Sequence, residues 1–175
     1  MDQADRRILD AVQKDGRASY QELGEAVGLS LSACHKRVKS LEANGVIARY
    51  AAIVDERKAG FPLSAFVSVT LRDQKKTTLA TFEKSVVARP EIMDCVLMSG
   101  DSDYLLRVIC SDLDSFEYLH KEVLTALPGV ERIKSAFAMR TVCRRTAVPV
   151  SMATKAFPGQ VATDPRTRKS VKTKT

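Results

Sequence analysis

The order of hydrophobic periodicities between residues 63 and 142 constrains the fold of this 175-residue chain more than any other feature. Alternating apolar residues predict strands, and apolar residues three or four positions apart predict helices. These patterns predict strands at 63–72, 92–99, 104–110 and 130–142, and helices at 77–89 and 112–127. The order strand-helix-strand-strand-helix-strand is that of a ferredoxin-like βαββαβ sandwich, in which two helices cover one face of a sheet.

The predicted strands are apolar on both faces. In the first strand Val67 and Val69 lie on one face and Phe66 lies on the other, and later strands repeat this arrangement. Because two helices cover only one face, the other face needs a partner, and the simplest partner is a second copy of the chain. We therefore expect a homodimer. The alternative is that the outward apolar residues stay partly exposed, as single apolar residues often do.

Three short helices are predicted in residues 1–45. Residues that cap helix N-termini mark where each begins: Asp2, Ser19 with Glu22 as a capping box, and Ser30. Gly16 suits the left-handed position that closes the first helix, and Gly28 suits a tight turn between the second and third. After the third helix, residues 46–54 predict a short strand beside the helices.

The third predicted helix has two different faces. Its inward stripe is apolar and consists of Leu31, Cys34, Val38 and Leu41. At about 100° per residue, the opposite face carries hydroxyl and basic side chains, with Arg37 on the flank and no acidic residue before Glu42. A helix-turn-helix motif over residues 20–39 would present this face to the major groove of DNA. The candidate DNA-binding residues are Ser30, Ser32, His35, Lys36, Arg37 and Lys39.

The net charge does not decide this interpretation by itself. The formal charge is +7, but residues 151–175 hold six Lys or Arg and one Asp. Residues 1–150 are therefore nearly neutral, so DNA binding has to be argued from local patterning. From residue 144 the periodicity fades, and residues 144–175 predict a basic flexible tail. The alternative to DNA binding is a solvated basic face on a helical module that binds protein.

The other chemistry-bearing residues argue against an enzyme or a metal site. The four cysteines, Cys34, Cys95, Cys110 and Cys143, form no C-x-x-C pair, and the only histidines are His35 and His120. We expect reduced thiols, no metal and no cofactor. The charged N-terminus predicts no secretory signal, and no apolar run is long enough for a membrane span. A cytoplasmic protein is therefore expected.

A turn-rich stretch, "GDSDY" at residues 100–104, separates two of the predicted strands. Gly100 would let the backbone approach a ligand closely, and successive turn amides can hold a carboxylate. Asp101 or Asp103 could pair with a protonated α-amine. The stretch therefore suits an amino-acid ligand. The alternative is a plain hairpin turn, because Gly, Asp and Ser favour turns on their own.

Four stretches of the chain resemble the leucine-responsive regulatory protein (Lrp/AsnC) family of bacterial and archaeal transcription regulators. They are "DQADRRILDAVQKDGR" at 2–17, "GLSLSACHKRVKSLEANGVIARYAA" at 28–52, "LMSGDSDYLLRV" at 97–108 and "LPGV" at 127–130. The resemblance covers both halves of the chain in the family's order. It implies a winged helix-turn-helix joined to a ligand-responsive βαββαβ domain that dimerises and assembles further into a tetramer or octamer.

The same resemblance implies an amino-acid pocket at the turn-rich stretch, where dimers meet. Carried over residue by residue, it implicates Leu97, Gly100, Asp101, Asp103, Tyr104 and Leu113. One departure concerns the last strand, where Ala136 and Arg140 stand at positions that in relatives often hold a bulkier or an acidic residue. The size and identity of the effector are therefore left open.

Together these patterns predict an α+β protein with four segments. They are a winged helix-turn-helix at 1–54, a linker at 55–62, an effector-binding and oligomerisation domain at 63–143, and the tail at 144–175. The predicted function is a sequence-specific transcriptional regulator, bound to double-stranded DNA in the nucleoid and responsive to an amino acid. The alternative is an architectural nucleoid protein that occupies many sites weakly.

Overall fold

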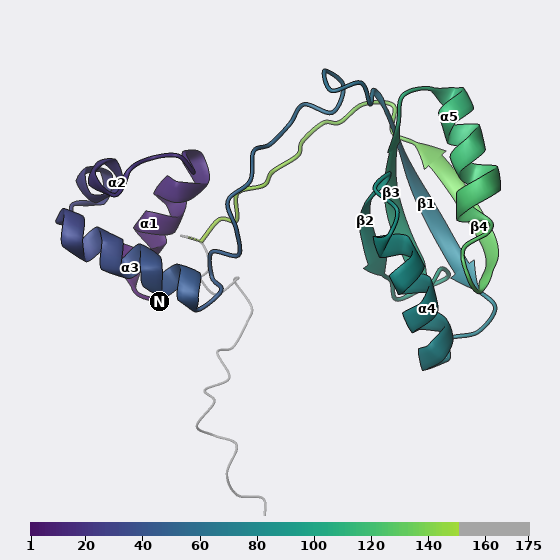
Figure 1. Cartoon of the computed structure of the whole chain (residues 1–175), viewed down its shortest axis with the longest axis horizontal. Coiled ribbons are helices and arrows are strands. Elements are labelled where there is room, and N and C mark those ends of the chain that lie inside the picture. Colours follow the sequence, from purple (N-terminus) through teal and green to yellow (C-terminus); the bar gives the residue numbers. More distant parts are fainter. Residues whose placement is uncertain (151–175) are drawn as a thin grey trace, which may run out of the picture. The chain divides into compact units, whose positions relative to one another are not determined.

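The computed structural model describes residues 1–150, which form two compact units (Figure 1). Residues 1–52 and 144–150 belong to the first unit, and residues 53–143 belong to the second. The expected tail therefore includes a part, residues 144–150, that packs with the first unit. Residues 151–175, the rest of that tail, lie outside the described residues.

The first unit contains the three expected helices: α1 (Gln3–Lys14), α2 (Tyr20–Val27) and α3 (Leu31–Ala43). Each predicted cap is present. The Asp2 carboxylate accepts a hydrogen bond from the Asp5 amide, and Ser19 and Glu22 form a reciprocal capping box. Ser30 accepts a hydrogen bond from the Ala33 amide. These bonds satisfy backbone N–H groups that have no partner inside a helix, so each helix begins where its cap stands.

The two glycine predictions have different outcomes. Gly28 has a φ of 72°, which allows the chain to turn sharply from α2 into α3. The prediction for Gly16 is wrong, because α1 ends at Lys14 and is closed by Asp15, which is extended with a φ of −138°. The Asp15 carboxylate accepts a hydrogen bond from the Arg17 amide at 2.8 Å, which makes a local turn without a left-handed residue.

One continuous apolar core holds the three helices together. It consists of Ile8, Leu9, Val12, Leu23, Val27, Cys34, Val38 and Leu41. The prediction that Leu31 faces inward is wrong, since this side chain is 57% exposed. Leu31 is the first residue of α3, and the buried stripe starts only one turn later, at Cys34.

Residues 46–54 form no strand, so this prediction is also wrong. A strand needs a neighbour to satisfy its backbone N–H and C=O groups, and within residues 1–150 all the strand pairs lie in the sheet of the second unit. The segment is mostly exposed, and its Tyr50 hydroxyl donates to the Glu42 carboxylate at 3.1 Å.

The second unit is the predicted sandwich. Its elements are β1 (Leu63–Leu71), α4 (Lys76–Val87), β2 (Ile92–Leu97), β3 (Tyr104–Cys110), α5 (Leu113–Tyr118), a π-helical turn η1 (Leu119–Leu124) and β4 (Val130–Phe137). The strands pair in the order β2-β3-β1-β4, and every pairing is antiparallel. This order places the central strands β1 and β3 side by side (Figure 1).

The helices cover one face of this sheet, where Val67, Leu106 and Phe82 are fully buried. On the other face Phe66 is 42% exposed and Val96 is 53% exposed, so the sheet carries apolar side chains on both faces, as the sequence pattern predicts. The Leu113 side chain does not join this core, since it is 62% exposed. Like Leu31, it is the first residue of its helix, and burial starts one turn later, at Phe116.

The residues expected to be a linker pack as part of the second unit. The Phe61 amide donates to the Glu56 carbonyl at 2.8 Å, which closes a turn. The Glu56 carboxylate lies 3.2 Å from Arg107 on β3, and Arg107 also pairs with Asp94 on β2 at 2.6 Å. No helix within residues 1–150 is long and apolar enough to cross a membrane.

Candidate functional site

The exposed face of α3 carries most of the predicted DNA-binding side chains. Ser32, His35, Lys36 and Lys39 are all exposed, while Cys34 and Val38 are fully buried on the opposite face. The Ser30 and Ser32 hydroxyl oxygens are 3.3 Å apart at the N-terminal end of the helix. The helix therefore presents hydroxyl groups at its start and basic groups along its length.

The two lysines of this face differ in their surroundings. Lys36 makes no hydrogen bond or ion pair with any residue in 1–150. The Lys39 ammonium lies 2.9 Å from the Glu42 carboxylate, but the side chain remains 57% exposed. The hydrogen bond to Glu42 raises the pKa of Lys39, so this side chain keeps its positive charge at neutral pH.

His35 is positioned by an aromatic contact. Its imidazole ring lies 4.7 Å from the Tyr20 ring, edge to face, which joins α3 to the start of α2. This contact holds the ring at the edge of the basic face.

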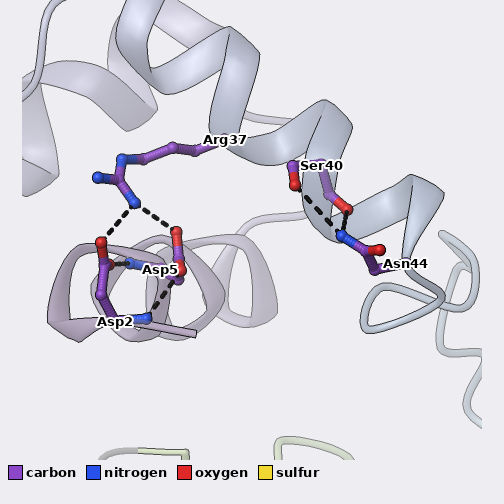
Figure 2. A network of polar contacts seen from close by, with 5 residues as sticks. All are labelled: Asp2, Asp5, Arg37, Ser40 and Asn44. Atoms are coloured by element: carbon purple, nitrogen blue, oxygen red, sulfur yellow. Dashed lines mark hydrogen bonds and ion pairs between the residues drawn. The ribbon is translucent and has the colours of Figure 1, made fainter.

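Arg37 acts within the unit (Figure 2). Its Nη1 atom donates to Asp2 at 2.8 Å and to Asp5 at 2.7 Å, so one nitrogen joins α3 to both carboxylates that cap α1. The Arg37 side chain is 36% exposed and the Asp5 side chain is 17% exposed. The guanidinium therefore ties α3 to the N-terminal end of α1.

Asn44 ends the same helix (Figure 2). Its Nδ2 atom donates to the Ser40 carbonyl at 2.8 Å and to the Ser40 hydroxyl at 3.2 Å. The side-chain amide thus satisfies a carbonyl in the last turn of the helix. Because the Ser40 hydroxyl accepts this bond from Asn44, the side chains available for DNA are those closer to the start of α3.

The bonds around Asp2 predict a pH dependence for the first unit. The backbone hydrogen bond from Asp5 and then the side chain of Arg37 lower the pKa of Asp2 below its ordinary value. A lowered pKa means that the contribution to stability is complete above about pH 4 and is lost as pH falls through the lowered value. We expect an NMR titration of the Asp2 carboxyl carbon to have its midpoint below the ordinary value, and Arg37→Gln to move it upward. A midpoint unchanged by Arg37→Gln would contradict the bridging role of Arg37.

The turn-rich hairpin between β2 and β3 separates its two aspartates. Asp103 is only 7% exposed, and its carboxylate accepts from the Leu71 amide at 2.7 Å and from the Gln74 side chain at 2.6 Å. Asp101 is exposed, next to Gly100, whose φ is 136°. The two carboxylates therefore have different environments, and only Asp101 is accessible to a ligand.

Tyr104 also points inward. It is 1% exposed, its ring lies 4.6 Å from the Phe82 ring, and its hydroxyl donates to Glu83 at 2.7 Å. Burial and then the hydrogen bond to Glu83 raise the pKa of this phenol. Tyr104 therefore joins β3 to α4 in the core rather than lining a surface.

The last two residues predicted to bind the effector, Leu97 and Leu113, are both exposed but lie at opposite ends of β3. Leu97, 58% exposed, ends β2 beside the hairpin. Leu113 follows β3, whereas the hairpin precedes β3, so the whole seven-residue strand separates them within one chain. Both could line one site only if a second copy contributed one of them.

A depression of about 130 Å³ lies beside the exposed part of the hairpin. It is lined by Ser68, Thr70, Asp101, Ser102, Arg132 and Lys134. The register of β1 and β4 pairs Thr70 with Arg132 and Ser68 with Lys134, which places both cations near Asp101. Sequence reasoning missed these two residues, although their alternation with Ile133 marks them as outward positions on β4.

Each of the two units matches a known protein family. Residues 1–48 match the family model described as "Winged helix-turn-helix DNA-binding", and residues 64–148 match the "Lrp/AsnC ligand binding domain". The chain is 43% identical over 150 residues to the Bkd operon transcriptional regulator of Pseudomonas aeruginosa, covering 86% of this chain and 98% of that protein. It is 38% identical over 142 residues to the leucine-responsive regulatory protein of Escherichia coli, covering 81% of this chain and 87% of that one.

A solved structure has a similar fold. A transcriptional regulator of Neisseria meningitidis in complex with L-Met has a TM-score of 0.83 and 32% identity, covering 87% of this chain and 99% of that chain. The fold and the exposed basic helix define a DNA-binding transcription regulator with a separate ligand-binding domain. The chain belongs to the Lrp/AsnC family, whose members are regulators and not enzymes.

Proposed function

We propose that the chain controls transcription by placing the exposed face of α3 in the major groove of an operator. The observation that carries this proposal is the contrast between the two faces of α3, one buried and apolar, the other exposed, basic and free of carboxylates before Glu42. Ser32 and His35 lie near the helix start, where recognition helices contact base edges. Lys36 and Lys39 would contact bases or phosphates. Ser30 caps the N-terminal end of the helix that enters the groove, and Arg37 orients this helix through its bonds to Asp2 and Asp5.

The proposal includes a homodimer. The exposed apolar residues on the outward face of the sheet, Phe66 and Val96 among them, are the support for a second copy packing there. A two-fold dimer would present two α3 helices to half-sites about one helical turn, roughly 34–36 Å, apart. Further assembly into a tetramer or octamer, and location in the nucleoid of the cytoplasm, are parts of the same proposal.

The effector is an amino acid bound at the hairpin. Asp101 would pair with its ammonium group, and Arg132 and Lys134 would pair with its carboxylate, because these side chains line one depression. Gly100 has no side chain and no other atom close to where one would stand, so a ligand can approach the backbone beside these residues. Asp103 and Tyr104 hold the hairpin on the sheet, and Leu97 and Leu113 would complete the site at a contact between copies. The L-Met complex of the Neisseria meningitidis regulator supports this ligand class.

Screening the twenty amino acids by thermal shift tests the effector proposal. A ligand at 100 times its Kd is expected to add about 2.7 kcal/mol to the free energy of unfolding. Arg132→Gln should reduce this shift, whereas Arg89→Gln, at the end of α4 away from the depression, should leave it unchanged. If no amino acid raised the melting temperature of a chain that still bound DNA, the effector proposal would fail.

A second candidate function is an architectural DNA-binding protein. It is favoured by the six Lys or Arg residues in 151–175, because phosphate contacts from a basic segment do not depend on sequence. Genome-wide occupancy separates the two functions: a few sharp sites support a regulator, and broad coverage supports an architectural protein.

A further inference from the structure

The segment that follows the second unit returns to the first and binds α1. The Gln13 side chain donates to the Val148 carbonyl at 3.1 Å, and the Val148 amide donates to the Gln13 Oε1 atom at 2.6 Å. One side-chain amide therefore satisfies both backbone groups of Val148, as a neighbouring strand would. Such a reciprocal pair fixes both the position and the direction of the segment.

Two further contacts fix the end of this segment. Arg6 donates to the Val150 carbonyl at 2.8 Å, and the Val150 side chain packs against the apolar core of the three helices. The Val150 amide donates to the Val148 carbonyl at 2.8 Å, which closes a tight turn around Pro149. Arg6 and Gln13 are seven residues apart on α1, so they share one face of the helix. We name residues Val148–Val150 the anchor.

The anchor determines where the last 25 residues begin. Residues 151–175 carry six Lys or Arg and one Asp, so this segment is strongly basic. Its first residue follows Val150, which is held by Arg6 on the same helix whose Asp2 and Asp5 carboxylates hold Arg37 of α3. The basic segment therefore starts on the unit that carries the candidate DNA-binding face. Fully extended, 25 residues reach at most about 85 Å, enough to follow DNA beyond one half-site.

We propose that the anchor fixes the basic C-terminal segment to the DNA-binding unit, where the segment makes a second, sequence-independent contact with DNA phosphates. This rests on the proposed function, because it requires α3 to bind DNA. Without the anchor, the segment would be attached through β4 of the second unit. The nearest fixed residue would then be Phe137, at the end of β4, instead of Val150. The middle of the basic segment would be about twice as many residues away from that fixed residue. Doubling a tether lowers the effective concentration at its target by about threefold.

The test measures the salt dependence of binding for the full chain, on an operator duplex and on an unrelated duplex. Four chains form a double-mutant cycle: wild type, Gln13→Ala, a chain that ends at Val150, and the combination. Ending the chain at Val150 is expected to reduce the salt slope on both duplexes, by about 0.9 for each phosphate that the segment neutralises. The ratio of operator to unrelated binding should stay the same.

Gln13→Ala in the full chain is expected to weaken binding to both duplexes by about threefold, and to have no effect in the shortened chain. Gln21→Ala serves as the matched control, since within residues 1–150 the only side-chain hydrogen bond of Gln21 on α2 is to Glu25. An equal effect of Gln13→Ala in full and shortened chains would overturn the anchor's role. An unchanged salt slope in the shortened chain, with binding intact, would overturn the DNA contact. Failure of all four chains to bind any duplex would instead overturn the proposed function.

Discussion

Replacing Lys36 and Lys39 together by alanine is expected to weaken operator binding by about 30-fold in 0.15 M salt and to reduce the salt slope by about 1.8. Each lysine that neutralises a phosphate releases counterions, so removing two such lysines takes about 0.9 each from the slope. Both side chains are exposed on α3, and neither contributes to the buried core of the unit. Fluorescence anisotropy over a range of salt concentrations measures both quantities.

The matched control is Lys84→Ala with Lys121→Ala in the second unit. This pair removes the same charge and reproduces the same surroundings, because Lys121 is paired with Glu117 as Lys39 is paired with Glu42. We expect the control to leave the slope almost unchanged and both double variants to keep the wild-type oligomer size. Equal losses of affinity in both variants would mean that net charge, and not the face of α3, supports binding.

Replacing Asp103 by alanine is expected to lower the free energy of opening of the β2–β3 hairpin by about 2–4 kcal/mol. The reason is that the buried Leu71 amide would have no charged acceptor, and an unsatisfied buried donor costs about 1–3 kcal/mol beyond the missing hydrogen bond. The carboxylate also accepts from Gln74, and the Asp103 amide donates to the Val69 carbonyl at 2.9 Å. Amide hydrogen exchange of the peptide containing β3 measures this opening.

Asp101→Ala is the matched control for this prediction. Asp101 is exposed two residues earlier in the same hairpin, so its replacement should change the free energy of opening by less than about 0.5 kcal/mol. Asp103→Asn keeps an acceptor for the Leu71 amide and should have an intermediate effect. If Asp103→Ala left exchange unchanged and abolished the effector response, Asp103 would belong to the ligand site and not to the hairpin's support.

Local signals predicted the helices well, because a cap depends on residues only three positions apart. The cap at Asp2 and the capping box at Ser19 are readable in the sequence, and so is the tight turn at Gly28. The strand expected at 46–54 fails for the opposite reason, because a strand depends on a partner that no local pattern supplies. Periodicity likewise cannot tell that Leu31, at the first position of its helix, lies beyond the packed core.

In the candidate site, too, the features set by nearby residues were predictable and the contacts between distant residues were not. The exposed face of α3 follows from helical period alone, and the structure agrees for Ser32, His35, Lys36 and Lys39. The pairing of Arg37 with Asp2 and Asp5 joins residues more than thirty positions apart, which a single sequence does not reveal.

The hairpin shows a similar limit. Its composition marks Asp101 and Asp103 alike, and only the contact with β1 shows that Asp103 is enclosed. Arg132 and Lys134 reach the same depression through the register of β4 on β1, which depends on the whole sheet.

Lysine acylation of the wild-type chain, read by mass spectrometry with and without a saturating operator duplex, tests the central claim most directly. If the exposed face of α3 lies in the groove, the duplex will protect Lys36 and Lys39 while Lys84 on α4 keeps its reactivity. If Lys36 is acylated equally fast in the bound chain, α3 does not face the DNA, and the proposed mode of operator recognition is wrong.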